Sequence, residues 1–266
     1  MHTTLLTDPA LPGADEDAGG VLGEVAVVLD GAGVPARFRA GCHHSVSWYS
    51  HALAARLLEI AQDPAIGLRD ALATAITRVG DLHREGCDLG SGGPSATVVM
   101  VRRTAEHLEH LVLCDSSLLL LGTSGEIVRV TDARVDEVAR AESTAEAIES
   151  RRNAPGGFWV ARHEPEAAEQ ALVGRTPLSD LEAVHLVSDG ITRAVDLLGL
   201  HDDTSLAHAL SEDPASLLED LRAAERDLPV GRRPRKAHDD ATVLTLLLPR
   251  GHRRAVEPEH LRVSGV

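Results

Sequence analysis

The stretch HDDATVLTLLL, residues 238–248, places two adjacent aspartates directly before a run of β-branched residues and leucines. A short apolar run of this composition is typical of a buried strand. Like charges repel one another, and burial adds to the cost of keeping them ionised. Asp239 and Asp240 therefore need an explanation beyond strand formation, and the other predicted strand ends supply one.

Aspartates stand at one end of four apolar runs in the sequence. The runs are EVAVVLD (24–30), HLVLCD (110–115), EAVHLVSDG (182–190) and ATVLTLLL (241–248). A single aspartate at a strand end is most often a turn former. Several that converge repel one another unless a cation lies among them. Hard divalent cations, which bind carboxylate and carbonyl oxygens, would supply that charge, so the pattern predicts an acidic metal site.

The composition is that of an acidic globular protein. The chain has 266 residues, of which 43% are hydrophobic, and a formal net charge of −15. This charge disfavours nucleic acid and anionic membranes as partners and favours a cationic ligand. The N-terminus lacks the features of a signal peptide, and no stretch approaches the roughly 18 apolar residues of a membrane span. We therefore expect a soluble, cytoplasmic protein.

The cysteines and an adjacent histidine pair give no clear site in the sequence. Cys42, Cys87 and Cys114 are widely spaced, odd in number and without a CxxC pair, which predicts neither a disulfide framework nor a zinc knuckle. His43 and His44 precede a predicted helix with no further ligand at helical spacing, so surface histidines are expected. Cys87 and Cys114 have no basic neighbour in the sequence that would make them nucleophiles.

The order of predicted elements favours a single α+β domain. Helical spacing is found over residues 45–62, 65–85, 134–153, 164–172, 191–198, 204–211 and 214–227. Strands are predicted over residues 24–30, 95–103, 110–115, 117–122, 126–130, 158–162, 182–190 and 241–248. Because strands and helices occur in groups, a layered α+β domain is favoured over repeated βαβ units.

Six segments in order resemble the motif series of the metal-dependent protein phosphatases of the PPM, or type-2C, family. They are ADEDA (14–18), VVLDGAG (27–33), GGPSATVV (92–99), LCDSSLLL (113–120), HLVSDGITR (185–193) and DDATV (239–243). The stretch RPRKAHDDATV resembles bacterial members. The resemblance implies a four-layer αββα sandwich of two antiparallel sheets flanked by helices. It places the phosphatase domain at 13–249, with tails at 1–12 and 250–266.

The resemblance also implies a two-metal centre of Mn²⁺ or Mg²⁺ ions with a weaker third ion. Asp30 would bridge both inner ions, and the carbonyl group of Gly31 would bind one of them. Asp189 and Asp239 would complete the inner site.

Four further acidic residues match positions around that centre. Glu16 and Asp17 match the family's acidic pair before the first strand and would bind metal directly or through water. Asp115 matches the aspartate of the third ion. Asp240 replaces an asparagine common in other members and would support the ligands rather than bind metal.

Two departures from the family pattern concern the phosphate site and the third ion. Many members have an arginine before the acidic pair that clamps the substrate phosphate, whereas this region reads LPGADEDA. Arg193, or Arg37 and Arg39, could take over a contact of this charge-assisted kind. The second departure is the sequence Cys-Asp-Ser-Ser at 114–117, where the family more often has Gly-Asp-Ser-Arg.

The resemblance implies a signalling phosphatase that hydrolyses phosphoserine and phosphothreonine by attack of a metal-bridged hydroxide. Its partner would be a phosphorylated protein substrate of a serine/threonine kinase, and the chain would be a monomer. The first alternative is a pseudophosphatase, a binding or regulatory module on the same fold, suggested by the missing arginine. The second is a metal-dependent hydrolase of small phosphorylated metabolites.

Overall fold

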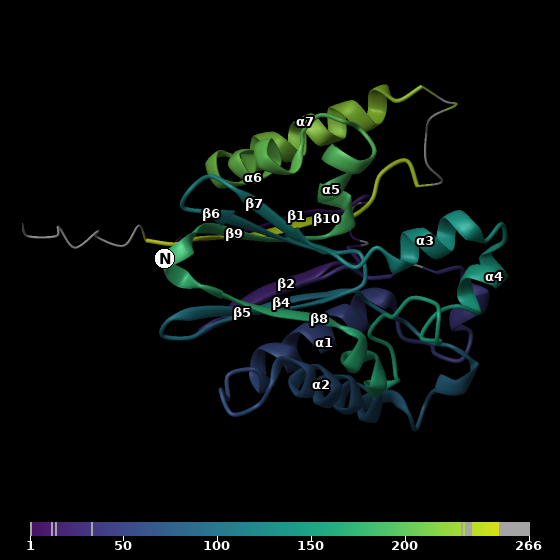
Figure 1. Ribbon diagram of the computed structural model, residues 1–266. Coiled ribbons are helices and arrows are strands. Elements are labelled where there is room, and N and C mark those ends of the chain that lie inside the picture. Colours follow the sequence, from purple (N-terminus) through teal and green to yellow (C-terminus); the bar gives the residue numbers. More distant parts are fainter. Residues whose placement is uncertain are drawn as a thin grey trace, which may run out of the picture.

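The computed structural model describes residues 2–11, 13, 15–32, 34–229, 231 and 236–249. Two five-stranded antiparallel sheets lie face to face between two outer layers of helices (Figure 1). The first sheet has the order β1 (His2–Asp8), β10 (Ala241–Leu247), β9 (Leu181–Val187), β6 (Ser117–Gly122) and β7 (Ile127–Val130). The second has the order β2 (Ala18–Leu22), β3 (Val25–Leu29), β4 (Val98–Arg103), β5 (His107–Leu113) and β8 (Leu172–Pro177).

Each sheet is covered by its own helices. Those on the second sheet are α1 (Val46–Ile60) and α2 (Leu68–His83), and those on the first are α5 (Asp189–Asp196), α6 (Asp203–Glu212) and α7 (Pro214–Asp227). Two short helices at one edge of the sandwich are α3 (Arg134–Ala141) and α4 (Ala145–Glu149). Single 3₁₀ turns occur at Ala36–Arg39, Leu89–Ser91, Pro165–Gln170 and Leu178–Asp180.

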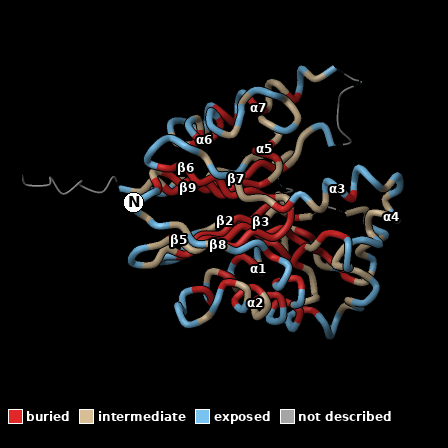
Figure 2. The backbone as a smooth tube through the Cα atoms, in the orientation of Figure 1, coloured by how far each residue is buried: buried red, intermediate tan, exposed pale blue. Residues whose placement is uncertain are grey.

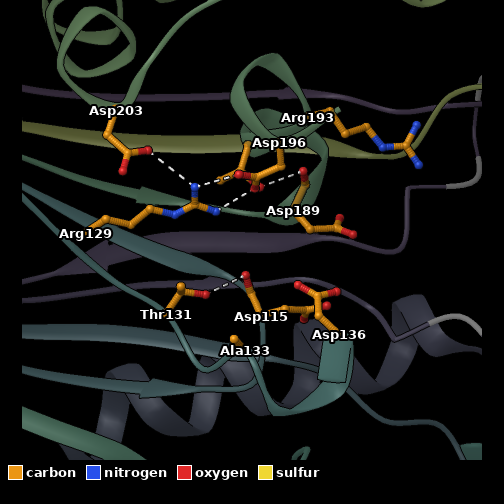
Figure 3. Close-up of a pocket in the computed structure, with 10 residues that line it drawn as sticks. Asp115, Arg129, Thr131, Ala133, Asp136, Asp189, Arg193, Asp196 and Asp203 are labelled. Atoms are coloured by element: carbon orange, nitrogen blue, oxygen red, sulfur yellow. Dashed lines mark hydrogen bonds and ion pairs between the residues drawn. The ribbon is translucent and has the colours of Figure 1, made fainter. Parts of the chain in front are cut away.

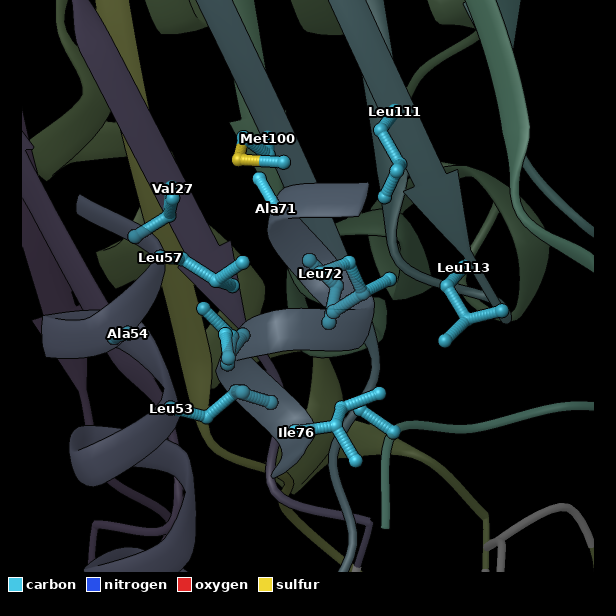
Figure 4. Packing of buried hydrophobic residues seen from close by; sticks show 14 of the residues in the cluster. Val27, Leu53, Ala54, Leu57, Ala71, Leu72, Ile76, Met100, Leu111 and Leu113 are labelled. Atoms are coloured by element: carbon cyan, nitrogen blue, oxygen red, sulfur yellow. The ribbon is translucent and has the colours of Figure 1, made fainter. Parts of the chain in front are cut away.

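The central strands are apolar throughout because both of their faces are covered. In β3, Val27 and Leu29 pack against α1 and α2 (Figure 4), whereas Val28 faces the other sheet. In β10, Val243 packs toward α5, α6 and α7, whereas Leu244 lies between the sheets. The strand period of two therefore sends alternate side chains to two different cores. Figure 2 shows these buried strands at the centre of the molecule.

Side chains at the helix ends explain where several helices begin. The Ser45 side chain accepts a hydrogen bond from the backbone N–H of Trp48 at the start of α1. Helix α7 has Pro214 in its first turn, and the Asp213 side chain accepts from the N–H of Ser216. These are the residue types that satisfy free N–H groups at helix starts.

The predicted fold class is confirmed, and the local errors concern weak edge elements. Residues His2–Asp8 fall in the predicted N-terminal tail but form β1, which pairs with β10. The helix predicted over 134–153 is interrupted between α3 and α4, and that over 164–172 is a 3₁₀ turn followed by strand β8. The strand predicted over 158–162 forms only isolated bridges.

The sequence patterns of strands β1, β2 and β8 are too weak for these strands to be predicted. Strand β2 contains two adjacent glycines, which are depleted in strands. Strands β1 and β8 lie at sheet edges and alternate between exposed and half-buried residues. No helix in the described ranges is both long and apolar enough to cross a membrane. The predicted C-terminal tail at 250–266 lies outside those ranges.

Candidate functional site

The register of the two sheets brings the aspartates at the strand ends to one edge of the sandwich. Asp30 directly follows β3, and Asp115 lies in the three-residue connection between β5 and β6. Asp189 begins α5 directly after β9, and Asp239 precedes β10. Val187 pairs with both Ser117 and Val243, so the segments that carry Asp115, Asp189 and Asp239 are neighbours in the first sheet.

Hydrogen bonds between buried hydroxyl and backbone groups join Asp30 to the segment that carries Asp115. The N–H of Asp30 donates to Thr97 Oγ1 at 3.1 Å, and the N–H of Thr97 donates to the Asp30 carbonyl at 2.9 Å. Thr97 Oγ1 also lies 2.6 Å from Ser116 Oγ. These contacts fix the backbone of Asp30 and join it to Ser116, the residue after Asp115, while both carboxylates line the cavity.

Two glycines permit the close approach of the acidic segments. A Cβ atom at Gly31 would overlap the carbonyl oxygen of Glu16, and one at Gly190 would overlap the carbonyl oxygen of Asp240. Only glycine can occupy either position without a backbone shift, because the obstructing atoms belong to the main chain. The glycine after Asp30 and the glycine after Asp189 are therefore part of what brings the carboxylates together.

A small cavity of about 160 Å³ collects most of the predicted ligands. Its lining includes Asp30, Gly31, Thr97, Asp115, Asp189 and Asp239. Burial, reinforced by the charge of Asp189 and then of the other carboxylates, raises the pKa of Asp30 well above its usual value. Burial together with Asp115 and Asp239 raises the pKa of Asp189 to about 7. Burial is also the main reason why the pKa of Asp115 is raised.

The acidic pair and Asp240 lie beside this cavity. Glu16, Asp239 and Asp240 line an adjoining cavity of about 410 Å³. Asp17 is buried, and its carboxylate oxygens have no hydrogen-bond partner among the described residues. Burial raises the pKa of Asp17 to about 7. Its carboxylate oxygens lie within 4.8 Å of those of Asp15 and Asp240.

Asp240 holds the backbone of the N-terminal segment through hydrogen bonds. Its two carboxylate oxygens accept hydrogen bonds of 2.7 Å from the backbone N–H groups of Ala10 and Glu16. Asp240 thus anchors the segment that presents the acidic pair.

The donor set suits hard divalent cations. Five carboxylates lie close together here, because the charges of Asp17, Asp115, Asp189 and Asp239 all contribute to the raised pKa of Asp30. Such a group is costly without a compensating positive charge. The unpartnered oxygens of Asp17 are available as ligands, and Mg²⁺ and Mn²⁺ prefer oxygen donors of this kind.

Two of the three arginines proposed from the sequence as phosphate ligands, Arg193 and Arg37, are engaged by carboxylates. Arg193 donates to Glu225 at 2.9 Å and to Asp239 at 2.8 Å. Arg37 pairs with Glu146 at 2.7 Å on the surface. Neither lines the small acidic cavity, although Arg193 lines the larger one beside it.

Two cations that the sequence analysis missed do line the small acidic cavity, Arg152 and Lys236. Arg152 donates to Glu149 at 2.8 Å, and its guanidinium lies 5.0 Å from the ring centre of Phe158. Lys236 Nζ lies 2.7 Å from the carboxylate of Asp239. The position of Lys236, three residues before Asp239, was a usable signal. Nothing in the local sequence marks Arg152, because only the fold brings it to the cavity.

A larger cavity of about 490 Å³ adjoins the first (Figure 3). Asp115, Asp136 and Asp189 face it, and Asp136 is a further acidic residue without a sequence signal. Arg129 forms ion pairs of 2.7 Å with Asp196 and 3.3 Å with Asp203 along its wall. Figure 3 shows that the guanidinium of Arg193 points away from the group of Asp115 and Asp136.

The protein is a sandwich of two antiparallel sheets with buried carboxylates at one edge. Proteins of this class can hold divalent cations at that edge. The chain belongs to the protein phosphatase 2C family, whose sequence model matches residues 12–224. No curated protein matches it in a sequence search.

Solved structures of bacterial phosphatases share the fold. The serine/threonine phosphatase PstP/Ppp of Mycobacterium tuberculosis is 18% identical with a TM-score of 0.61, covering 92% of this chain and 97% of that one. Stp1 of Staphylococcus aureus is 15% identical with a TM-score of 0.61, covering 93% and 94%. A structure of the PstP catalytic domain in complex with two manganese ions is 15% identical with a TM-score of 0.57, covering 92% and 96%.

Proposed function

We propose that this chain is a serine/threonine phosphoprotein phosphatase that uses two Mn²⁺ or Mg²⁺ ions held by Asp30, Asp189 and Asp239. The observation that carries the proposal is the convergence of buried carboxylates on one small cavity, where burial and then the charges of neighbouring carboxylates raise the pKa of Asp30 and of Asp189. Membership of the protein phosphatase 2C family supports the reaction. The structure with two manganese ions among the similar folds supports the metal.

The remaining acidic residues have subsidiary roles in this proposal. The carbonyl of Gly31 and the carboxylates of Glu16 and Asp17 would add ligands to the inner ions. Asp115, with Asp136 beside it, would hold a weaker third ion. When bound, the ions lower the pKa of a water that attacks phosphorus and neutralise charge on the phosphoryl group.

Arg152 and Lys236 are the residues that we expect to bind the substrate phosphate. Both line the cavity that contains Asp30 and Asp189, and the Arg152 side chain is only 8% exposed. A guanidinium offers paired N–H donors that match phosphate oxygens, and an ammonium adds a point charge. They would replace the arginine that the family places before the acidic pair. The matching positions Pro12 and Ala14 lie outside the described residues.

A protein substrate fits the open surroundings of the small cavity. The cavity of about 490 Å³ beside it provides room for residues that flank a phosphorylated side chain. A phosphoprotein made by a serine/threonine kinase is therefore the proposed partner, with the chain acting as a cytoplasmic monomer.

The test compares substrates at a fixed Mn²⁺ concentration. Phosphoserine and phosphothreonine peptides are expected to be hydrolysed, with p-nitrophenyl phosphate as a poorer substrate. Asp239→Asn should lose most of the rate, whereas Asp220→Asn, at an exposed position of α7, should retain it. Phosphopeptide binding without turnover would favour the pseudophosphatase. Turnover confined to small phosphorylated metabolites would favour the metabolite hydrolase.

A further inference from the structure

Two cysteines and two histidines meet where α1 begins and α2 ends, in a cluster that the proposed phosphatase reaction does not use. Cys42 and His44 lie in the loop before α1, His83 is the last residue of α2, and Cys87 follows in the next turn. One ligand atom from each of the four residues lies within 4.8 Å of the others. His43 and His44 were expected to be surface histidines at a helix start; His43 is exposed, whereas His44 is half-buried in this cluster.

The individual distances approach those of a tetrahedral site. The Nδ1 atom of His44 lies 3.5 Å from the sulfurs of both Cys42 and Cys87, and Nδ1 of His83 lies 3.2 Å from Cys42 Sγ. Zinc–ligand bonds of about 2.3 Å to sulfur and 2.0–2.1 Å to nitrogen give tetrahedral S–N edges of about 3.5 Å and an S–S edge of about 3.8 Å. The two sulfurs are 3.0 Å apart, so zinc would require them to separate by about 0.8 Å.

Burial makes the cluster hard to explain as ordinary packing. Cys42 and His83 are buried, and the Cys42 thiol beside Nδ1 is the one side-chain hydrogen-bond partner of His83 in the described part of the chain. Trp48 covers the imidazoles, with its ring centre 4.1 Å from that of His44 and 5.1 Å from that of His83. Thiols are weak hydrogen-bond donors and satisfy imidazole nitrogens poorly, whereas a metal ion would engage all four groups.

The charges also balance for a divalent ion. Imidazoles bind metal in their neutral form, and cysteines bind it as thiolates. Two thiols would lose their protons to solvent on binding, and two thiolates cancel the charge of one divalent ion. A neutral complex is compatible with the buried position.

We propose that Cys42, His44, His83 and Cys87 form a structural site for one zinc ion. Two sulfur and two nitrogen ligands leave no coordination position for substrate, which is the arrangement of structural zinc. The ion would fasten the start of α1 to the end of α2. Val46, the first residue of α1, lies directly against Gly31, so the fastening would also support one wall of the acidic cavity. The softer ligands distinguish this site from the oxygen donors of the acidic cavity.

The test is the metal content of the full-length protein after purification without chelator and dialysis against metal-free buffer. Wild type is expected to retain about one zinc per chain, as is Asp239→Asn, because the acidic cavity is a separate site. Cys42→Ser and Cys87→Ser should each lose it. His51→Gln, at an exposed histidine on α1, is the matched control and should retain it.

A measurement on wild type avoids dependence on variants that fail to fold. Cobalt substituted into the site should show the thiolate-to-cobalt charge-transfer absorption of a tetrahedral centre, which oxygen ligands do not give. Three free thiols with no zinc and no such absorption would overturn the proposal. A Cys42–Cys87 disulfide, detected as a mass lower by two hydrogens, would overturn it as well.

Discussion

Asp189→Asn is expected to stabilise the metal-free protein while destabilising the metal-bound one. Burial and neighbouring carboxylates raise the pKa of Asp189 from 3.8 to about 7. At 1.36 kcal/mol per pKa unit, the charged form costs the folded state about 4 kcal/mol at high pH. This value is an upper limit for the variant, since Asp115 and Asp239 share the same repulsion.

The pH dependence has a definite sign. The folded protein binds the Asp189 proton more tightly than the unfolded chain does, so the free energy of unfolding falls as pH rises from 3.8 towards 7 and levels off above it. Linkage gives a cost of about 2 kcal/mol at pH 5 and about 4 kcal/mol at pH 8. The Asp189→Asn variant does not have this pH-dependent cost. It also loses a favourable charge in the first turn of α5, which is worth only about 0.3–1 kcal/mol.

The assay is urea unfolding at pH 5 and pH 8 in excess chelator, followed by fluorescence of Trp48 and Trp159. The variant should exceed wild type in free energy of unfolding by about 2–4 kcal/mol at pH 8 and by less at pH 5. Saturating Mn²⁺ should reverse the order, because ligand binding stabilises only the protein that retains the site. A variant less stable than wild type in chelator at both pH values would refute the reasoning and assign Asp189 a purely structural role.

Three further substitutions and one control variant test particular contacts. Gly190→Ala, whose new Cβ would overlap the carbonyl oxygen of Asp240, should cost at least about 2 kcal/mol in urea unfolding, and an unchanged midpoint would contradict the close approach. Arg152→Ala should raise KM for p-nitrophenyl phosphate about tenfold with a smaller change in kcat, as expected for lost substrate binding. Arg37→Ala should leave both constants unchanged; equal effects of the two variants would remove Arg152 as a phosphate ligand. Lys236→Met removes a cation that competes with metal for the Asp239 carboxylate, so calorimetric titration should show tighter Mn²⁺ binding. The KM for p-nitrophenyl phosphate should rise as well, and weaker Mn²⁺ binding would argue against competition.

The central strands and the aspartates of the small cavity could be predicted because each rests on a strong local signal. A strand covered on both faces is a continuous apolar run, as in VAVVL of β3, and the aspartates directly follow or precede such runs. The edge strands β1, β2 and β8 could not be predicted in this way, since partial exposure and glycines weaken their patterns.

The two cationic side chains of the acidic cavity and the cluster of two cysteines and two histidines were missed for a different reason. Arg152 reaches the acidic cavity, and His83 reaches Cys42, only through contacts between distant segments of the chain. Spacing along a single helix, the test applied to His43 and His44, does not detect ligands that come from two helices and a loop. Cys114, in contrast, is a departure from the family pattern that was visible in the sequence and that its backbone conformation accounts for. Its φ of 70° explains why the family more often has glycine there.

The central claim is that the acidic cavity binds divalent ions that the phosphatase reaction requires. Its most direct test measures bound Mn²⁺ by equilibrium dialysis and phosphopeptide hydrolysis on the same samples of wild type and Asp30→Asn. Wild type should bind about two ions and lose all hydrolysis in excess chelator, with recovery on adding Mn²⁺, as a two-metal site requires. Asp30→Asn should lose at least one ion and most of the rate. Full hydrolysis by wild type in excess chelator would contradict the account.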